Sequence, residues 1–404
     1  MKPAWLTSLK ITLLFLLSFI GMNTFAATEK HIKIATFNVS MEGSNYLEKG
    51  QKTPSADKLQ NLLQNDDNQQ IRNIAEILQR VRPDIVLLNE FDYIADADKG
   101  VKAFIKRYLN QSQNGAEPID YPYFHIGPVN TGVPSPYDLD HDGVASGVGG
   151  DAWGFGFYPG QYGMVVLSRY PIDDEHIRTF QLLKWSAMPN AQQPIDPASN
   201  QPWYNTEQWQ ALRLSSKAHW DIPVNVDGEW LHVLAAHPTP PVFDGPEDRN
   251  GKRNHDEIRL WADYLTGGTA ASYIVDDQGR QGGFSQNARF VLLGDMNSAP
   301  YPTADQSGAV RQLIDHPLVN GSFVPMSQGG AEYVPDVEES KSYTASWKER
   351  ADYVLPSKAG MKVLDGGVFW PEKASPLYRL IKDRSDSSDH RLVWLSVALA
   401  PIDK

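Results

Sequence analysis

Short apolar runs recur along the chain, and several of them end in a polar residue. Runs of about four to eight aliphatic and β-branched residues are typical of strands that are buried on both faces. We therefore predict eight strands, at residues 31–39, 84–90, 162–169, 212–221, 229–237, 289–294, 351–355 and 391–399.

Helical spacing of apolar residues marks three other segments. Between residues 71 and 81 they recur at i, i+3, i+4 and i+7, which predicts an amphipathic helix that Pro83 ends. Similar spacing predicts helices over residues 101–109 and 256–265.

No repeat or linker divides the chain. Many strands and fewer helices in mixed order predict an α+β fold, in which two packed sheets are covered by helices. We expect residues 27–404 to form a single domain. Segments rich in Gly, Pro, Asp or Asn interrupt it as loop insertions near 127–160 and 183–209.

The first 26 residues predict a secretory signal peptide. Lys2 and Lys10 flank an apolar run, residues 11–20, that is shorter than the roughly 20 residues a membrane span needs. Small residues up to Ala26 then fit a cleavage site before Ala27. An uncleaved anchor is the alternative. We expect a secreted or periplasmic protein with no transmembrane segment after cleavage.

Composition excludes some chemistry. The chain has no cysteine, which rules out disulfides, thiolate zinc sites and cysteine nucleophiles. Its formal net charge is −12. Loss of the predicted signal removes Lys2 and Lys10, which makes the charge −12 − 2 = −14. An acidic chain without a run of Lys and Arg argues against tight, sequence-independent binding to nucleic acid.

Polar residues at the ends of the predicted strands are the candidate functional residues. Each of them has an ordinary explanation as a turn former or a solvated strand end. Together they would face one cleft, because strand ends and loops on a rigid scaffold carry most functional side chains. They are Asn38, Glu90, His237, Asp295, Asn297, Asp389 and His390.

The segments around these residues resemble the endonuclease/exonuclease/phosphatase superfamily. The matching stretches follow the family's order, and the Gly-Asp-x-Asn and Ser-Asp-His pieces are the specific ones. The resemblance covers almost the whole mature chain and implies a four-layer α/β/β/α sandwich of two mixed sheets flanked by helices. The stretches are residues 36–39, 87–90, 293–297, 350–355 and 388–390.

Two departures from the family pattern remove no functional group. Asn89 stands where glutamine is common, and Met296 replaces the usual aromatic residue.

The resemblance also implies a metal site. Asn38, Glu90 and Asp389 would hold Mg²⁺ or Mn²⁺, with Glu90 as the principal anionic ligand. Hard divalent cations of this kind prefer oxygen ligands and keep several waters.

The remaining positions would act on the substrate. Asp295 would accept a proton from the attacking water, and Asn297 would orient that water or the phosphate. His390 would donate to a phosphoryl oxygen, with its ring held by Asp352. His237 would contact phosphate or protonate the leaving group, although it could also be a strand-end histidine in a proline-stiffened turn.

These assignments predict a metal-dependent phosphatase or phosphodiesterase that uses direct attack of water on a phosphoester. The alternatives are an extracellular nuclease of the same fold and a catalytically silent binding protein. We expect a monomer whose partner is a phosphoester substrate, with nucleic acid as the less favoured one.

A second acidic group suggests calcium. Asp138, Asp140 and Asp142 alternate before a glycine, like the start of a calcium loop. The twelfth loop position is Gly149 rather than glutamate, so this is not a complete EF-hand, and Asp151 would be a later ligand. A solvated acidic turn is the alternative.

Two other groups of residues each have a functional and a structural interpretation. A basic group would meet a substrate phosphate or form a solvated helix face; it comprises Arg249, Lys252, Arg253, His255 and Arg259. An aromatic group would line the cleft or pack in the core; it comprises Trp153, Phe155, Phe157, Tyr158 and Tyr162.

Overall fold

The computed structural model describes residues 1, 30–285, 287–301 and 308–402. The predicted signal segment therefore lies, apart from Met1, outside the described residues. Within the part that is described, no helix has both the length and the apolarity needed to cross a membrane.

The first large sheet has the strand order β12-β13-β1-β2-β4-β3. It is mixed, because β1 runs parallel to β2 and antiparallel to β13. Its strands are β1 (Lys30–Met41), β2 (Ile85–Phe91), β3 (Tyr123–Ile126), β4 (Met164–Ser168), β12 (Met361–Val368) and β13 (Val393–Leu399).

The second large sheet has the order β11-β10-β9-β8-β5 and is also mixed, since β10 runs parallel to β9 and antiparallel to β11. Its strands are β5 (Arg178–Thr179), β8 (His219–Val226), β9 (Glu229–Ala236), β10 (Arg289–Asp295) and β11 (Asp352–Pro356). A separate two-stranded sheet joins β6 (Ile195–Asp196) to β7 (Gln201–Pro202).

The helices are mostly short. The α-helices are α1 (Lys58–Gln64), α2 (Gln69–Val81), α3 (Val101–Phe104), α4 (Thr206–Ala211), α5 (Arg249–Thr266), α6 (Arg311–Ile314) and α7 (Gln328–Tyr333). The other helical turns are η1 (Gly43–Tyr46), η2 (Ile105–Leu109), η3 (Trp185–Ala187), η4 (Glu338–Ser342) and η5 (Pro376–Leu380).

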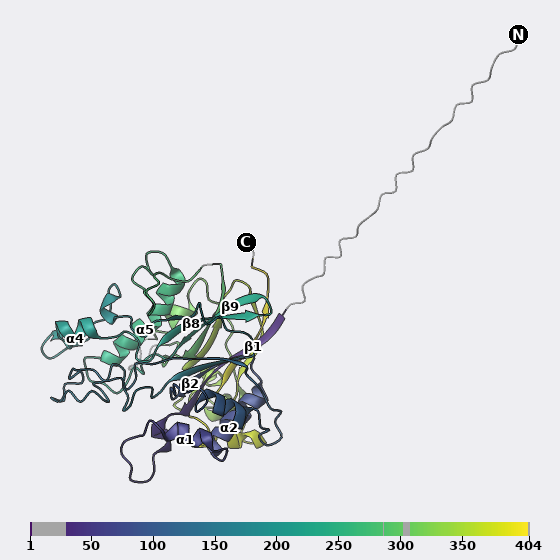
Figure 1. Ribbon diagram of the computed structural model, residues 1–404, viewed down its shortest axis with the longest axis horizontal. Coiled ribbons are helices and arrows are strands. Elements are labelled where there is room, and N and C mark those ends of the chain that lie inside the picture. The colour runs from purple at the N-terminus through teal and green to yellow at the C-terminus, as the bar shows by residue number, and fades with distance from the viewer. Residues whose placement is uncertain (2–29, 286, 302–307, 403–404) are drawn as a thin grey trace.

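The sheets pack face to face between helices, as the four-layer expectation required. Figure 1 shows α1 and α2 outside the sheet that holds β1 and β2, with α5 on the far side of β8 and β9. Alternate residues of β10 face different layers: Val291 and Leu293 join the apolar cluster of the first sheet, whereas Leu292 packs in the cluster that contains Trp261 of α5. The α+β sandwich is confirmed.

Helix α2 shows how closely local sequence can specify an element. The Asn68 side chain accepts a hydrogen bond from the Ile71 N–H and caps the first turn. Arg82 ends the helix in a left-handed conformation, and Pro83 follows it. The predicted span 71–81 is therefore correct to within two residues.

Three predicted elements differ from the structure. The strand placed at 212–221 is β8, which begins at His219, because backbone carbonyls of the preceding segment bond to Arg253 instead of to a strand. Helix α5 begins seven residues before the predicted 256, because its first two turns carry no apolar residue and their buried position is the polar Asn254. The helix predicted over 101–109 divides into α3 and the π-helical turn η2.

The two insertions differ in content. Residues 127–160 contain only isolated bridges, such as Thr131 with Gly154, and no described helix or strand. Residues 183–209 contain η3, β6, β7 and most of α4.

Candidate active site

The candidate residues meet where parallel strands of both sheets end. Asn38 lies near the end of β1, and Asp295 is the last residue of β10. Asn38 Nδ2 donates to Asp295 Oδ2 across the sandwich at 3.1 Å. Asn89 of β2 adds a second bridge, because its Oδ1 accepts from the Asp295 backbone N–H at 3.2 Å. The two sheets are thus joined directly at the candidate site.

Two histidines approach the same carboxylate oxygen. His237 Nε2 and His390 Nε2 each lie 3.4 Å from Asp295 Oδ2. Burial by itself would raise the pKa of Asp295, but His390, His237 and the Asn38 amide lower it far below its usual value. Asp295 is therefore a buried, firmly ionised carboxylate.

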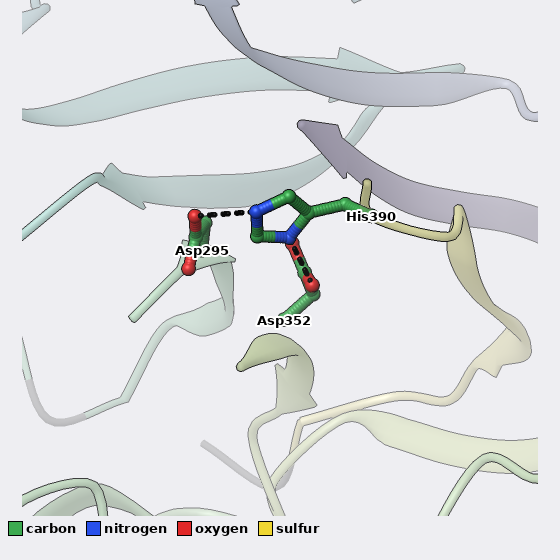
Figure 2. A group of neighbouring side chains, drawn as sticks. All are labelled: Asp295, Asp352 and His390. Atoms are coloured by element: carbon green, nitrogen blue, oxygen red, sulfur yellow. Dashed lines mark hydrogen bonds and ion pairs between the residues drawn. The ribbon is translucent and has the colours of Figure 1, made fainter. Parts of the chain in front are cut away.

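His390 lies between two carboxylates, as Figure 2 shows. Its Nδ1 is 2.8 Å from Asp352 Oδ2, on the opposite side of the ring from Asp295. Thr344 Oγ1 donates to Asp352 Oδ2 at 2.7 Å and accepts from the Asp352 backbone N–H. Asp352 is thus held in place, and it fixes both the tautomer and the orientation of the His390 ring.

The electrostatics favour a charged His390. Burial lowers the pKa of its imidazole, but Asp352 and Asp295 outweigh this effect and raise the pKa to about 10. The imidazolium can then donate from Nε2 while Nδ1 stays bonded to Asp352. Asp295, Asp352 and His390 also bring ligand atoms within 4.8 Å of one another. Two members of this group, Asp352 and His390, are already hydrogen-bonded to each other.

Glu90, Asn38 and Asp389 form a different group of oxygen ligands. Burial, followed by the charges of Asp389 and Glu42, raises the pKa of Glu90 to about 7, against a hydrogen bond from Asn38 that lowers it. Carboxylates that repel one another in this way are suited to a cation. Glu90 also has a left-handed backbone, with φ at 57°, which turns its side chain out of the strand direction. These residues fit a hard divalent ion.

Asp389 and Asn297 have defined positions. Asp389 Oδ1 accepts from Ser40 Oγ at 3.1 Å, and its Oδ2 pairs with Arg384 at the same distance. Asn297 is left-handed at φ 47°, its N–H donates to Asp295 Oδ1 at 2.9 Å, and its amide donates to Pro238 O. The Asp-x-Asn segment is therefore a tight turn that places both side chains at the end of β10.

His237 is neutral where His390 is charged. Burial and the positive charge of Lys217 lower the pKa of His237 to about 4, against the pull of Asp295. Its Nδ1 is buried without a hydrogen-bond partner among the described residues. His237 can therefore act as a neutral donor or acceptor, and an unpartnered buried nitrogen is a reason to expect a ligand there.

The acidic loop, residues 138–151, brings together only some of the predicted calcium ligands. Asp138, Asp140 and Asp151 bring carboxylate oxygens within 4.8 Å of one another, whereas Asp142 is not a member of this group. Asp138 Oδ1 is buried without a partner in the described part of the chain. Asp142 Oδ1 instead accepts from the Val144 N–H at 2.8 Å, so it serves a local turn.

The basic group lies within α5 and contacts the scaffold. Arg253 donates to the carbonyls of Arg213, Leu214 and Ser215, and Lys252 donates to Glu247 O. These contacts favour a structural role. The remaining three pair with nearby groups: Arg249 with Glu247, His255 with Asp256 and Arg259 with Asp263.

The aromatic group is divided. Tyr158 is buried and donates its hydroxyl to Asp92 at 2.5 Å, which makes it part of the scaffold. Phe155 and Phe157 are exposed at the surface and contact each other edge to face. Trp347, which was not predicted, packs against the His390 ring with centroids 4.7 Å apart and remains 43% exposed.

Three residues that contact the site residues or carry charge near them were not predicted from the sequence. Thr344 and Trp347 come from a segment without regular spacing, so nothing in the sequence marks them. Lys217 is 5% exposed. Its signal is weak, because a lysine between predicted apolar positions is usually solvated.

Comparison of the sequence with known proteins gave one family match. A sequence model described as the Endonuclease/Exonuclease/phosphatase family matches residues 35–390. No curated protein sequence matches the chain.

Three solved structures illustrate what the chain is similar to. An endonuclease/exonuclease/phosphatase from Beutenbergia cavernae is 15% identical, with 92% of this chain and 72% of that chain covered and a TM-score of 0.49. Sphingomyelinase C from Streptomyces griseocarneus is 16% identical, with 91% and 99% covered and a TM-score of 0.44. The human Nocturnin catalytic domain is 12% identical, with 92% and 98% covered and a TM-score of 0.44.

Proposed function

Because this chain belongs to the endonuclease/exonuclease/phosphatase family, whose members hydrolyse phosphoester bonds, we propose that it is an exported, metal-dependent phosphatase or phosphodiesterase. The observation that carries the proposal is the crowding around Asp295 Oδ2. One amide and two imidazoles, from Asn38, His237 and His390, lie within 3.4 Å of that oxygen.

Glu90, Asn38 and Asp389 would hold Mg²⁺ or Mn²⁺. The ion supplies charge neutralisation for the phosphoryl oxygens when it is bound. The support for these ligands is the raised pKa of Glu90, to about 7, which burial and the neighbouring Asp389 cause.

The other residues act on water and phosphate. Asp295 accepts a hydrogen bond from the attacking water and aligns it, while the Asn297 amide holds the water or a phosphoryl oxygen. The lowered pKa of Asp295, caused mainly by His390, makes it a weak base. We therefore assign it the proton only once the new P–O bond is forming. His390 donates from Nε2 to a phosphoryl oxygen, and Asp352 is its positioning residue.

The metal requirement gives the direct test of this function. Hydrolysis of small phosphomonoesters and phosphodiesters should need Mg²⁺ or Mn²⁺ and should stop in excess chelator. Glu90→Gln should raise the metal concentration for half-maximal activity about tenfold or more, because the neutral amide loses the charge that holds the cation. Glu48→Gln, at a side chain that is 79% exposed, is the matched control and should behave as wild type. Full activity in excess chelator would contradict the proposal.

The preferred substrate class is a small or locally exposed phosphoester. A net charge of −12 disfavours long polyanions. A nuclease that grips several phosphates loses affinity with a slope of about −0.9 per phosphate in log–log salt plots. Duplex DNA cleavage that collapses as salt rises, without hydrolysis of small esters, would establish the nuclease instead.

We also propose that calcium binds the group formed by Asp138, Asp140 and Asp151. The buried Asp138 Oδ1 without a partner supports this, as does Gly150, where a Cβ atom would lie 2.3 Å from Asp140 Oδ2. A ligand bound only to the native state at a hundredfold excess over its Kd stabilises it by about 2.7 kcal/mol. Calcium should therefore raise the melting temperature.

The structure supplies a matched pair of variants for this site. Asp140→Ala should abolish the calcium-dependent rise in melting temperature, whereas Asp142→Ala should keep it, because Asp142 lies outside the group. Equal rises in wild type and Asp140→Ala would refute this location.

A further inference from the structure

Lys217 is a buried cation with few hydrogen-bond partners among the described residues. It lies two residues before β8 and is 5% exposed. Its Nζ makes one long hydrogen bond, 3.5 Å to Pro238 O, and within the described residues it forms no ion pair. A buried ammonium is costly unless it is paired and hydrogen-bonded, so the position calls for an explanation.

The surrounding carboxylates do not supply that explanation. Burial lowers the pKa of Lys217, and the charges of Glu257, Glu90 and Asp295 oppose this shift, which places the ammonium in the field of the candidate site. Glu257 is already occupied: its Oε1 accepts from Ser216 N and Oγ, and its Oε2 accepts from Thr239 N. The ammonium therefore has donors without an acceptor among the described residues, which points to a ligand.

The backbone around Lys217 is held by several hydrogen bonds. Asn130, at the start of the long insertion, donates its N–H to Lys217 O at 3.0 Å and its amide to Ser215 O at 2.8 Å. Arg253 also donates to Ser215 O. Gly154 approaches so closely that a Cβ atom would lie 2.0 Å from Ser216 O. The insertion and α5 thus hold this segment from two sides.

His237, which contacts Asp295 and precedes Pro238, is neutral. Lys217 acts with burial to lower the pKa of His237 to about 4, so that His237 contributes no positive charge. A phosphoryl group brought to Asp295 would consequently lie in the field of two cations, His390 and Lys217, both of which interact with the charge of Asp295.

We propose that the Lys217 ammonium binds a non-bridging oxygen of the substrate's phosphoryl group, which makes it a further catalytic residue. The inference rests on the proposed phosphoester hydrolysis. Charge on the phosphoryl oxygens develops as the P–O bond breaks, and a preorganised donor in a water-poor site stabilises it. The long insertion then contributes to catalysis through Asn130, which fixes the Lys217 backbone.

The test is the affinity for inorganic phosphate, measured by calorimetry on the full chain with saturating Mg²⁺. Lys217→Met should weaken phosphate binding about tenfold to a hundredfold, the effect of one charged hydrogen bond. Its affinity for Mg²⁺, measured separately, should stay equal or increase, because a nearby cation opposes metal binding. Lys217→Arg should restore part of the phosphate affinity.

The matched control is Lys33→Met. Lys33 is another partly buried lysine that donates to a backbone carbonyl, Val81 O at 2.8 Å. It lies five residues before Asn38 along β1, roughly 16 Å away at strand rise. This variant should bind phosphate as wild type does.

Two results would overturn the inference: wild-type phosphate affinity in Lys217→Met, or weakened Mg²⁺ binding that accounts for the whole loss. Should Lys217→Met fail to fold, the wild-type Nζ resonance, assigned by its loss in Lys217→Arg, must shift when inorganic phosphate is added. No shift would also refute the proposal. Lost phosphate binding in Lys217→Met, together with no turnover of any phosphoester by wild type, would keep the binding role and reject the proposed function.

Discussion

His390→Ala and Asp352→Ala are each expected to reduce turnover by roughly 10³-fold or more, the upper range for a positioned acid or base. The 2.8 Å contact between His390 Nδ1 and Asp352 Oδ2 makes the pair one unit. Removing Asp352 takes away the main charge that raises the pKa of His390 to about 10 and frees the ring to rotate.

The double variant should therefore lose little beyond either single variant. Effects within catalytic units are strongly non-additive. The measurement is kcat for all four proteins at saturating metal and substrate. Asp352→Asn adds a second comparison, because it keeps the size of the side chain while removing its charge. Losses that multiply in the double variant would show that the two residues act separately.

Asp295→Asn should have a comparable effect, with kcat reduced by roughly 10²- to 10⁴-fold. The substitution preserves volume and an acceptor for the Asn38 amide, but it removes the charge that faces both imidazoles. The amide can neither take the proton from water nor hold His390 in its charged form as strongly.

Metal affinity separates this loss of turnover from misfolding. Asp295→Asn should keep its metal affinity, because Glu90 and Asp389 remain the anionic ligands of the proposed metal site. A variant that binds Mg²⁺ normally and still turns over substrate at more than a tenth of the wild-type rate would contradict the role of Asp295.

The extent to which the sequence predicted the fold follows from burial. Strands such as β10 are buried on both faces, so their apolar runs stand out and their bounds are predicted to within a residue or so. Strand β12 was not predicted, because its alternation is interrupted by a register shift and by Gly366 and Gly367. Edge strands that pack on one side carry a weaker pattern.

The site was predictable to the extent that its residues follow strands. Asn38 and Asp295 lie at or near strand ends, where a polar residue after an apolar run is visible. Asp352 begins β11 and was predicted only through the family resemblance. Thr344 and Lys217 take part only through tertiary contacts, which leave no periodic trace in the sequence. The acidic loop shows the same limit: regular spacing favoured Asp142, which the fold leaves out of the group, whereas Asp151, suggested as a later ligand, is part of it.

The pairing of β1 with β13 in the first sheet sets the time at which the site around His390 can form. Strand β1 pairs with β13 from Lys30 opposite Leu399 to Thr36 opposite Val393, and His390 lies three residues before β13. A chain still on the ribosome lacks this pairing until β13 has emerged, and contacts so far apart in sequence form slowly. The site around His390 therefore cannot assemble before β13 has been synthesised, and its assembly reports on the closing of the first sheet rather than on any earlier intermediate.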